Sequence, residues 1–192
     1  LRFNMRADVG NAPWYAIQVE RTGAPSNGSN RDVKFMRIYQ DADEDDLLDT
    51  GKDRAISSPK AKLTSDILDT AVAPFAVGNV DVSSFPFSGY LWMDNKELMA
   101  YTKVNNSSIT ITARSQRLGD NLTAAVSHSS GITFEKVDVF DQNSEASRLA
   151  TIYITTQTIE SGKEKTYFLT YDIGNEAKDQ NSVGIKISDR GW

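Results

Sequence analysis

The chain has 192 residues, of which 39% are hydrophobic and 24% are charged, the balance of a globular protein that can bury a sizeable core. Its 21 basic and 26 acidic residues give a net charge of −5, and no stretch approaches the roughly 18 consecutive apolar residues of a membrane span. Because nucleic acids are bound through clustered Lys and Arg, this composition disfavours both membrane-spanning and nucleic-acid-binding proteins.

Apolar and polar side chains alternate along most of the chain, which is the period of a half-buried strand. Leu1–Asp8, Trp14–Thr22 and Val33–Gln40 are the first predicted strands. Later runs rich in Val, Ile, Thr, Tyr and Phe continue the pattern at 109–112, 132–140, 150–156, 166–171 and 183–188. Roughly ten short strands separated by turn signals predict an all-β fold, an antiparallel β-sandwich of the immunoglobulin-like kind.

Two segments depart from this alternation. The apolar residues of 63–72 have nearly helical spacing behind a Thr-Ser N-cap, and they predict a short helix. Residues 94–97 fit either a capping box that opens a helix or a hairpin turn between strands at 89–93 and 98–104. Aromatic residues at alternate positions of the first of these strands favour the hairpin.

No internal repeat and no low-complexity linker divides the chain, so residues 1–192 are predicted to form a single domain. The soft candidates for a boundary are residues 57–60 and 78–86. Without cysteine, the chain has no disulfide, no thiol nucleophile and no thiolate metal site. It starts inside a predicted strand and without Met, as expected of a processed or excised piece of a longer protein.

Residues 41–53 carry most of the acidic excess. They hold seven acidic side chains and one basic one, a local charge of −6, whereas the rest of the chain has 20 basic and 19 acidic residues. Their carboxylates have the spacing of calcium loops in EF-hands and dockerin-type modules, in which alternate residues point at one ion. The predicted calcium ligands are Asp41, Asp43, Asp45, the backbone carbonyl of Leu47, Asp49 and Asp53.

The loop departs from an EF-hand in three ways. Asp46 stands where the EF-hand has Gly, and it must take up a left-handed conformation that Asp tolerates better than most residues. Lys52 stands where the bidentate Glu is expected, which leaves Asp53 to close the shell. The preceding segment is a predicted strand and not a helix. The alternative is a solvated acidic turn without an ion, but self-repulsion among so many carboxylates favours a bound cation, and calcium over magnesium.

No catalytic constellation is recognisable, and the chain is predicted not to be an enzyme. His128, the single histidine, lies among three serines in what we expect to be an exposed polar turn, without a nucleophile-elbow motif. Zinc lacks further His or Cys ligands, and no phosphate-binding glycine loop is present. A glycosidase needs two carboxylates facing each other across a cleft, and the spacing of the acidic residues predicts no such pair.

Aromatic residues offer a second kind of site. A platform for sugars is conceivable from Trp14, Trp92 and Trp192 with Tyr15 and Tyr90, although core packing is the commoner fate of strand aromatics. Acceptor motifs for N-glycosylation begin at Asn27, Asn105, Asn106 and Asn121. Neither feature assigns a ligand-binding residue.

Two stretches of the chain, Ala12–Asp41 with the acidic loop and Gln157–Ile187, are similar to the repeated β-sandwich modules of large bacterial cell-surface proteins. In those modules a Trp-bearing strand leads to a Tyr-x-Asp calcium loop, here Tyr39 to Asp41, and a Tyr-Phe-Leu-x-Tyr-Asp-Ile strand lies near the end. The resemblance covers roughly half of the chain and leaves residues 59–136 without a counterpart, as an insertion or a second subdomain. It implies an extracellular, non-enzymatic module that calcium stiffens.

The sequence therefore predicts a secreted, calcium-binding structural or assembly module of a surface layer, filament or adhesin on the cell surface. Its expected partners are neighbouring copies or modules of the same protein, joined through sheet edges such as 1–8 or 183–188. A glycan is a further candidate partner; nucleic acid and a membrane span are not expected. The alternative is a carbohydrate-binding module of a secreted protein, which requires at least two of Trp14, Tyr90, Trp92 and Trp192 exposed on one face.

Overall fold

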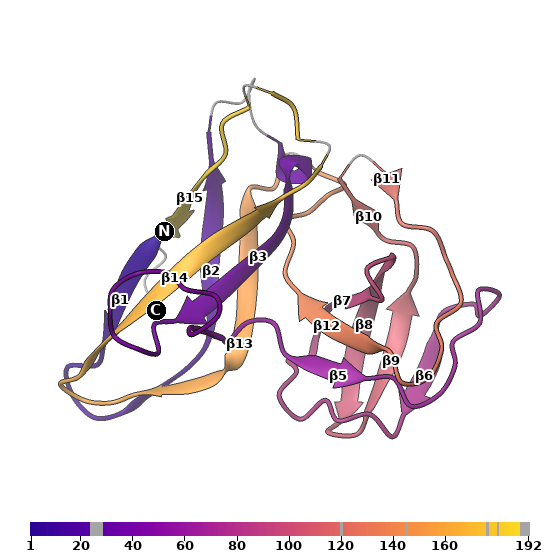
Figure 1. The fold of residues 1–192 in the computed structure, drawn as a ribbon, viewed down its shortest axis with the longest axis horizontal. Coiled ribbons are helices and arrows are strands. Elements are labelled where there is room, and N and C mark those ends of the chain that lie inside the picture. The colour runs from indigo at the N-terminus through magenta and orange to yellow at the C-terminus, as the bar shows by residue number, and fades with distance from the viewer. Residues whose placement is uncertain (24–28, 120, 145, 176, 180, 189–192) are drawn as a thin grey trace. The chain divides into compact units, whose positions relative to one another are not determined.

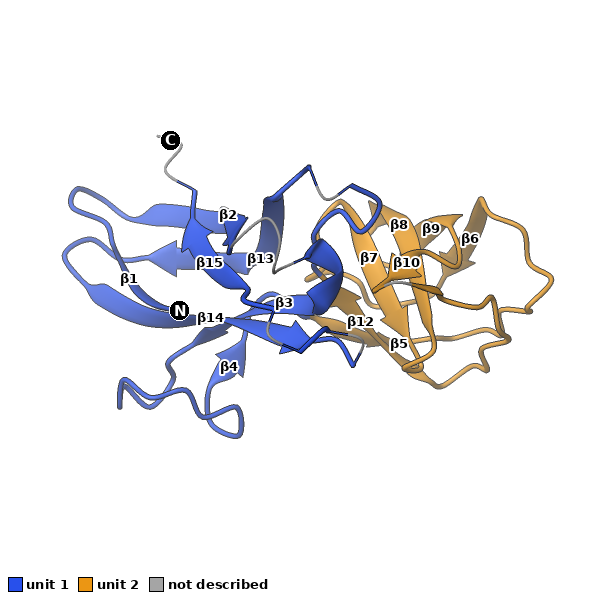
Figure 2. Ribbon diagram, turned by 90° about the horizontal axis from the view of Figure 1, so that it is seen from above, with its two compact units in different colours: residues 1–58, 138–192 blue, residues 59–137 orange. Residues whose placement is uncertain are grey.

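The computed structural model describes residues 1–23, 29–119, 121–144, 146–175, 177–179 and 181–188 (Figure 1). Over these residues the protein is all-β, with several antiparallel sheets, one short 3-10 turn and no α-helix. No helix in this part of the chain has the length and hydrophobicity needed to cross a membrane. The chain divides into two compact units (Figure 2), residues 1–58 with 138–192 (unit 1) and residues 59–137 (unit 2).

Unit 1 contains two sheets, counted over the described residues. The four-stranded sheet has the order β1-β14-β3-β4 and the three-stranded sheet the order β13-β2-β15. The strands are β1 (Arg2–Arg6), β2 (Ala12–Thr22), β3 (Val33–Gln40), β4 (Arg54–Ala55), β13 (Leu149–Ile159), β14 (Glu164–Ile173) and β15 (Gly184–Ile187), and the 3-10 turn is η1 (Asn30–Asp32). The longer ones lie where apolar and polar residues alternate in the sequence.

Both sheets of unit 1 contribute to one hydrophobic core. Ile17 and Ile152 come from the three-stranded sheet, and Ile38 and Leu169 from the four-stranded one. Trp14 joins them, since its ring lies 4.8 Å from that of Tyr167 in an edge-on contact. Burying such faces is the main favourable term in folding, so the alternating pattern and the two-sheet arrangement have the same cause.

Unit 2 is built on a six-stranded sheet that curls into a half-barrel, in the order β5-β12-β7-β8-β9-β6 (Figure 1). Its strands are β5 (Lys60–Lys62), β6 (Phe75–Gly78), β7 (Ser88–Met93), β8 (Glu97–Asn105), β9 (Ser108–Ala113) and β12 (Thr133–Val137), and a separate two-stranded ribbon pairs β10 (Arg117–Leu118) with β11 (Asn121–Leu122). Leu91, Met99, Ile111 and Phe134 lie in its own core. This unit spans nearly the segment that has no counterpart in the family resemblance.

The short helix predicted at 63–72 is wrong. Ile67 forms an antiparallel bridge with His128, in which each backbone N–H donates to the other's carbonyl at 2.8 Å. Leu63 and Ile67 are buried, but Leu68 and Val72 are 61% and 83% exposed. A helix would have placed all four on one face, so backbone pairing with a distant segment overrides the local spacing.

The hairpin at 94–97 is confirmed. β7 and β8 pair directly, with Met93 opposite Glu97. In the three-residue connection between them, Asp94 and Asn95 have left-handed φ angles of 49° and 57°, and the N–H of Lys96 closes the turn by donating to the carbonyl of Met93 at 2.9 Å. Asn and Asp tolerate this conformation, which explains why no helix begins here.

Gly23 is a sensitive point of unit 1, because its φ is +127° and an added Cβ would lie 2.2 Å from the carbonyl oxygen of Ser182. We expect Gly23→Ala to lower the free energy of unfolding by about 1–3 kcal/mol more than Gly10→Ala, measured by urea denaturation. Gly10 is the matched control, since its φ is +70° and an added Cβ meets nothing within 4 Å. Equal losses in the two variants would contradict this assignment.

Candidate metal centre

The acidic loop, residues 41–53, connects β3 to β4 at one end of the four-stranded sheet. It begins at Asp41, which is buried and whose N–H donates to the carbonyl of Thr166 on β14 at 3.1 Å. It ends at Asp53, which is also buried. The first and last residues of the predicted ligand set are therefore buried, and the backbone of the first is bonded to the sheet.

Backbone N–H groups hold these two carboxylates in place. The Asp41 carboxylate accepts from the N–H groups of Glu44 at 2.8 Å and Asp46 at 3.0 Å. The Asp53 carboxylate accepts from those of Ala42 at 3.1 Å and Asp49 at 2.8 Å. The loop thus coils around its own acidic side chains, because hydrogen bonds to an ionised carboxylate are among the stronger ones in proteins.

Two residues with side chains take up left-handed conformations in this coil. Glu44 has a φ of 59° and Asp46 a φ of 65°. Asp46 stands at the position of the EF-hand glycine, and the prediction that it accepts left-handed geometry is confirmed. The coil therefore bends without glycine at that position, at a small conformational cost that its hydrogen bonds offset.

The structure brings three of the predicted ligands together. Carboxylate oxygens of Asp41, Asp43 and Asp45 all lie within 4.8 Å of one another, a group that can hold a metal ion. Asp41 is buried, and the other two are exposed to solvent. All three donors are hard oxygens, the ligands that calcium and magnesium prefer.

The remaining predicted ligands lie in the same loop but outside this group of three. Leu47 donates its N–H to the Asp45 carboxylate at 2.9 Å. Asp49 accepts the N–H of Gly51 at 2.9 Å, and Asp53 is bonded to the backbone as described. Their proposed role as ligands stays a prediction.

Lys52 neutralises part of the loop. Its ammonium nitrogen lies 3.1 Å from Asp43 Oδ2 and 3.5 Å from Asp49 Oδ2, so it bridges two predicted ligands. The hydrogen bond and charge of Asp43, followed by Asp49, raise the pKa of Lys52. The N–H of Gly51 and the charge of Lys52 in turn lower the pKa of Asp49, although its slight burial opposes them. Sequence spacing alone marked Lys52 as a departure and gave no indication of this bridge.

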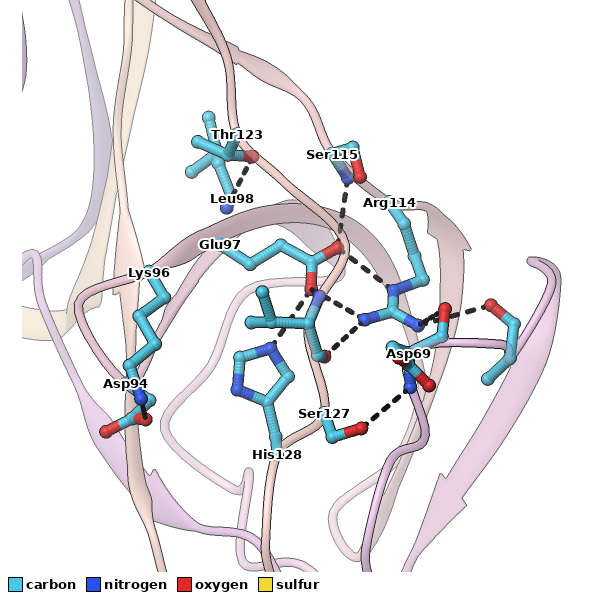
Figure 3. Close-up of polar contacts among 12 residues, drawn as sticks. Asp69, Asp94, Lys96, Glu97, Leu98, Arg114, Ser115, Thr123, Ser127 and His128 are labelled. Carbon is cyan, nitrogen blue, oxygen red and sulfur yellow. Dashed lines mark hydrogen bonds and ion pairs between the residues drawn. The ribbon is translucent and has the colours of Figure 1, made fainter.

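A second charged cluster lies inside unit 2 (Figure 3). The Glu97 carboxylate is fully buried and accepts from Arg114 at 2.7 and 2.9 Å and from His128 Nε2 at 3.0 Å. It also accepts the N–H groups of Ser115 at 3.1 Å and Val126 at 3.3 Å. Sequence analysis missed this cluster, whose members Glu97, Arg114 and His128 stand at the start of β8, directly after β9 and in the segment before β12.

His128 is buried, so the prediction of an exposed polar turn around it is wrong. Its bridge with Ile67 and its bond to Glu97 hold it inside the unit, and its Nδ1 has no partner among the described residues. The hydroxyl of Ser127 accepts the N–H of Asp69 at 3.1 Å and points away from the imidazole (Figure 3). The geometry is therefore that of a buried ion pair and not of a Ser-His dyad.

Two of the aromatic residues that a sugar-binding face would need are buried. Trp14 and Trp92 are 7% and 9% exposed. Their indole N–H groups donate to the Ala16 carbonyl at 2.8 Å and to the Asn95 side chain at 3.1 Å. Tyr15 is exposed, and Tyr90 is half-buried. Trp192 lies outside the described residues, as does Asn27.

Comparison with known proteins found no match for this chain among family models, curated proteins or solved structures.

The buried Glu97 predicts an acid-sensitive unit 2. Burial raises the pKa of this carboxyl, but the bonds from His128, Arg114 and Val126 outweigh it and lower the pKa from 4.5 to about 2. Because the folded-state pKa is depressed, this stabilisation is complete above pH 4.5 and is lost as the pH falls towards 2.

We expect Glu97→Gln to lower the free energy of unfolding by roughly 3–5 kcal/mol at neutral pH, because it leaves Arg114 buried without a counter-charge. The loss relative to the unmodified protein shrinks as the pH is lowered towards 2, and urea denaturation across pH measures it. The matched control is Asp94→Asn, which removes an exposed pair with Lys96 and changes stability by less than about 1 kcal/mol. A pH-independent loss in Glu97→Gln would show that the ion pair is not its cause.

Proposed function

We propose that this chain is an extracellular structural module of a surface layer, filament or adhesin, and that one calcium ion in residues 41–53 stiffens it. The observation that carries the proposal is the convergence of the Asp41, Asp43 and Asp45 carboxylates in a coiled loop. The extracellular setting and the structural role rest on the resemblance of the two halves of unit 1 to bacterial surface modules.

Calcium is the metal that best suits these donors. It takes 6–8 oxygen ligands in flexible geometry, and carboxylates, a backbone carbonyl and water together supply them. Magnesium demands a near-ideal octahedron and keeps most of its waters, so a loop that supplies many protein oxygens suits it less. Zinc prefers nitrogen and sulphur donors, which this loop lacks.

Binding would stiffen unit 1 through contacts that the loop already makes with two strands. Asp46 pairs with Arg2 on β1, and its carboxylate accepts from the hydroxyl of Thr166 on β14 at 3.2 Å. A divalent ion would reduce the local charge of −6 to about −4 and so relieve the repulsion that loosens the coil. A stiffer loop would also resist proteolysis, which acts on locally opened segments.

We further propose that unit 1 is immunoglobulin-like. Its sheets of four and three strands, counted over the described residues, share one core. The same division into four and three strands is found in constant-type immunoglobulin domains.

The test is a thermal melt in calcium and in excess chelator. At a free calcium concentration about 100 times the Kd, binding to the folded state adds about 2.7 kcal/mol and raises the Tm by roughly 5–10 °C. Asp43→Asn with Asp45→Asn should abolish this rise, whereas Asp81→Asn, an exposed acid of unit 2, should retain it. An unchanged Tm in calcium would remove the central claim.

The variant Lys52→Ala should distinguish the effect of the Lys52 ammonium group on stability from the effect of the metal ion. Without calcium the variant should melt at a lower temperature, because Asp43 and Asp49 lose their counter-charge. It should bind calcium more tightly, by roughly 3–10-fold in titration calorimetry, because the ion no longer competes with a cation. Lys163→Ala, which removes an exposed Lys paired with Glu160, is the control and should leave calcium affinity unchanged. Weaker calcium binding in Lys52→Ala would contradict this role.

A further inference from the structure

Unit 1 contains an apolar groove that its own described strands leave open. The groove has a volume of about 520 Å³, and residues of β1, the first half of β2 and the ends of β13 and β15 line it. Phe3 and Met5 on β1 and Trp14 on β2 form much of its apolar wall. It lies apart from the three acidic ligands of the proposed metal site, none of which lines it.

Both borders of the groove are free strand edges within the described residues. β1 pairs with β14 on one side and with no strand on the other. β15 pairs with β2 only from Val19 to Thr22, and Ser188 adds one bond to Gln18, so Ala12–Ile17 pair with β13 alone. On its free side the carbonyl of Ala16 is partly satisfied by the Trp14 indole. No other described strand bonds to the remaining groups of these edges, and unpaired edge groups can accept a further strand.

We propose that this groove receives an extended segment from a neighbouring subunit, which adds a strand along β1 and inserts alternate apolar side chains between the two sheets. This inference rests on the assembly role proposed above and identifies the groove as the contact between subunits. The dimensions fit, since β1 offers five residues of edge and β2 a free stretch of six. A strand of that length points about three side chains to one face.

The charged residues on β1 indicate which kind of strand can bind in the groove. The exposed residues of β1 that lie beside the incoming strand are Arg2, Asn4 and Arg6. Arg2 already pairs with Asp46, and Arg6 makes an exposed pair with Asp8 at 3.5 Å. Pairing of β1 with the β1 of a second copy, centred on Asn4, would place Arg2 opposite Arg6 twice, and like charges directly opposite are destabilising. A strand that carries acidic residues between its apolar ones would meet Arg6 favourably, because the exposed pair of Arg6 with Asp8 is weak. The occupant is therefore a different segment, apolar at alternate positions and acidic between them.

The probe is a labelled, capped peptide of alternating Val and Glu, added to the full chain and followed by fluorescence anisotropy. Saturable binding is expected. The same peptide with N-methylated backbone amides should bind about tenfold more weakly or worse, because it keeps the side chains but cannot donate to a strand edge. Equal binding of the two peptides would overturn the proposal, since the groove would then be taking apolar side chains without strand addition.

Variants of the chain locate the contact. Arg6→Glu should weaken the Val/Glu peptide about fivefold or more and leave a Val/Gln peptide nearly unchanged. Met5→Glu places a charge in the groove and should abolish binding, while Phe87→Glu, the same kind of change at an exposed site of unit 2, should not. Thermal melts confirm that each variant is folded. Binding that survives Met5→Glu in a folded protein would place the peptide elsewhere and overturn the proposal.

Two further measurements separate this contact from its alternatives. The peptide titration is repeated in calcium and in chelator. If calcium does not raise the Tm but the peptide still binds, only the metal proposal is refuted. If calcium raises the Tm but the peptide does not bind, only the proposal for the groove is refuted. Sedimentation of the chain alone tests self-pairing. A dimer that Arg6→Glu strengthens would show that β1 pairs with itself, and it would overturn the assignment of a separate donor strand.

Discussion

The acidic loop must hold seven acidic side chains within residues 41–53, and the way it does so shapes the proposed site. Its carboxylates are stabilised by hydrogen bonds from backbone N–H groups of the same loop. Six backbone N–H groups donate to the carboxylates of Asp41, Asp45, Asp49 and Asp53: those of Ala42, Glu44, Asp46, Leu47, Asp49 and Gly51. These bonds order the coil before any ion binds, so a metal would enter a loop whose main conformational cost has been met. Two cations, Lys52 and Arg2, reduce the remaining repulsion by pairing with Asp43 and Asp46.

The two charged clusters of this protein show opposite uses of the same chemistry. In the acidic loop the carboxylates outnumber their counter-charges and lie partly in solvent, which leaves room for a divalent ion. In unit 2 the single carboxylate of Glu97 receives a guanidinium, an imidazole and two backbone N–H groups away from solvent. Every lone pair of that carboxylate is engaged, so the cluster connects β8 with the segments around Arg114, Val126 and His128.

Local patterns predicted the fold class well and the long-range pairings poorly. Val33–Gln40 was predicted residue for residue, because alternation and β-branched residues report burial on a pleated surface. β4, β10 and β11 have two residues each, too few for any period to be visible, and they exist through their partners. The same limit explains His128 and Ile67: neither polar neighbours nor helical spacing reveals a bridge between segments 61 residues apart in sequence. In the acidic loop, the spacing of the sequence identified the three converging aspartates. It could not show the hydrogen bonds to Asp53 or the bridge made by Lys52, because both depend on the three-dimensional path of the loop.

The acidic loop and the groove meet on one strand. Among the described strands, β1 is an edge strand that pairs with β14 only, and elements with so few partners are the first to open. Arg2 at its beginning is tied to Asp46 in the loop, whereas Phe3 and Met5 face the groove. A rigid loop thus fixes one end of the edge to which a neighbouring strand would add, and an ordered edge lowers the entropy that the incoming strand must overcome. The proposed stiffening of the loop and the proposed assembly at the groove would in this way both depend on how β1 is held.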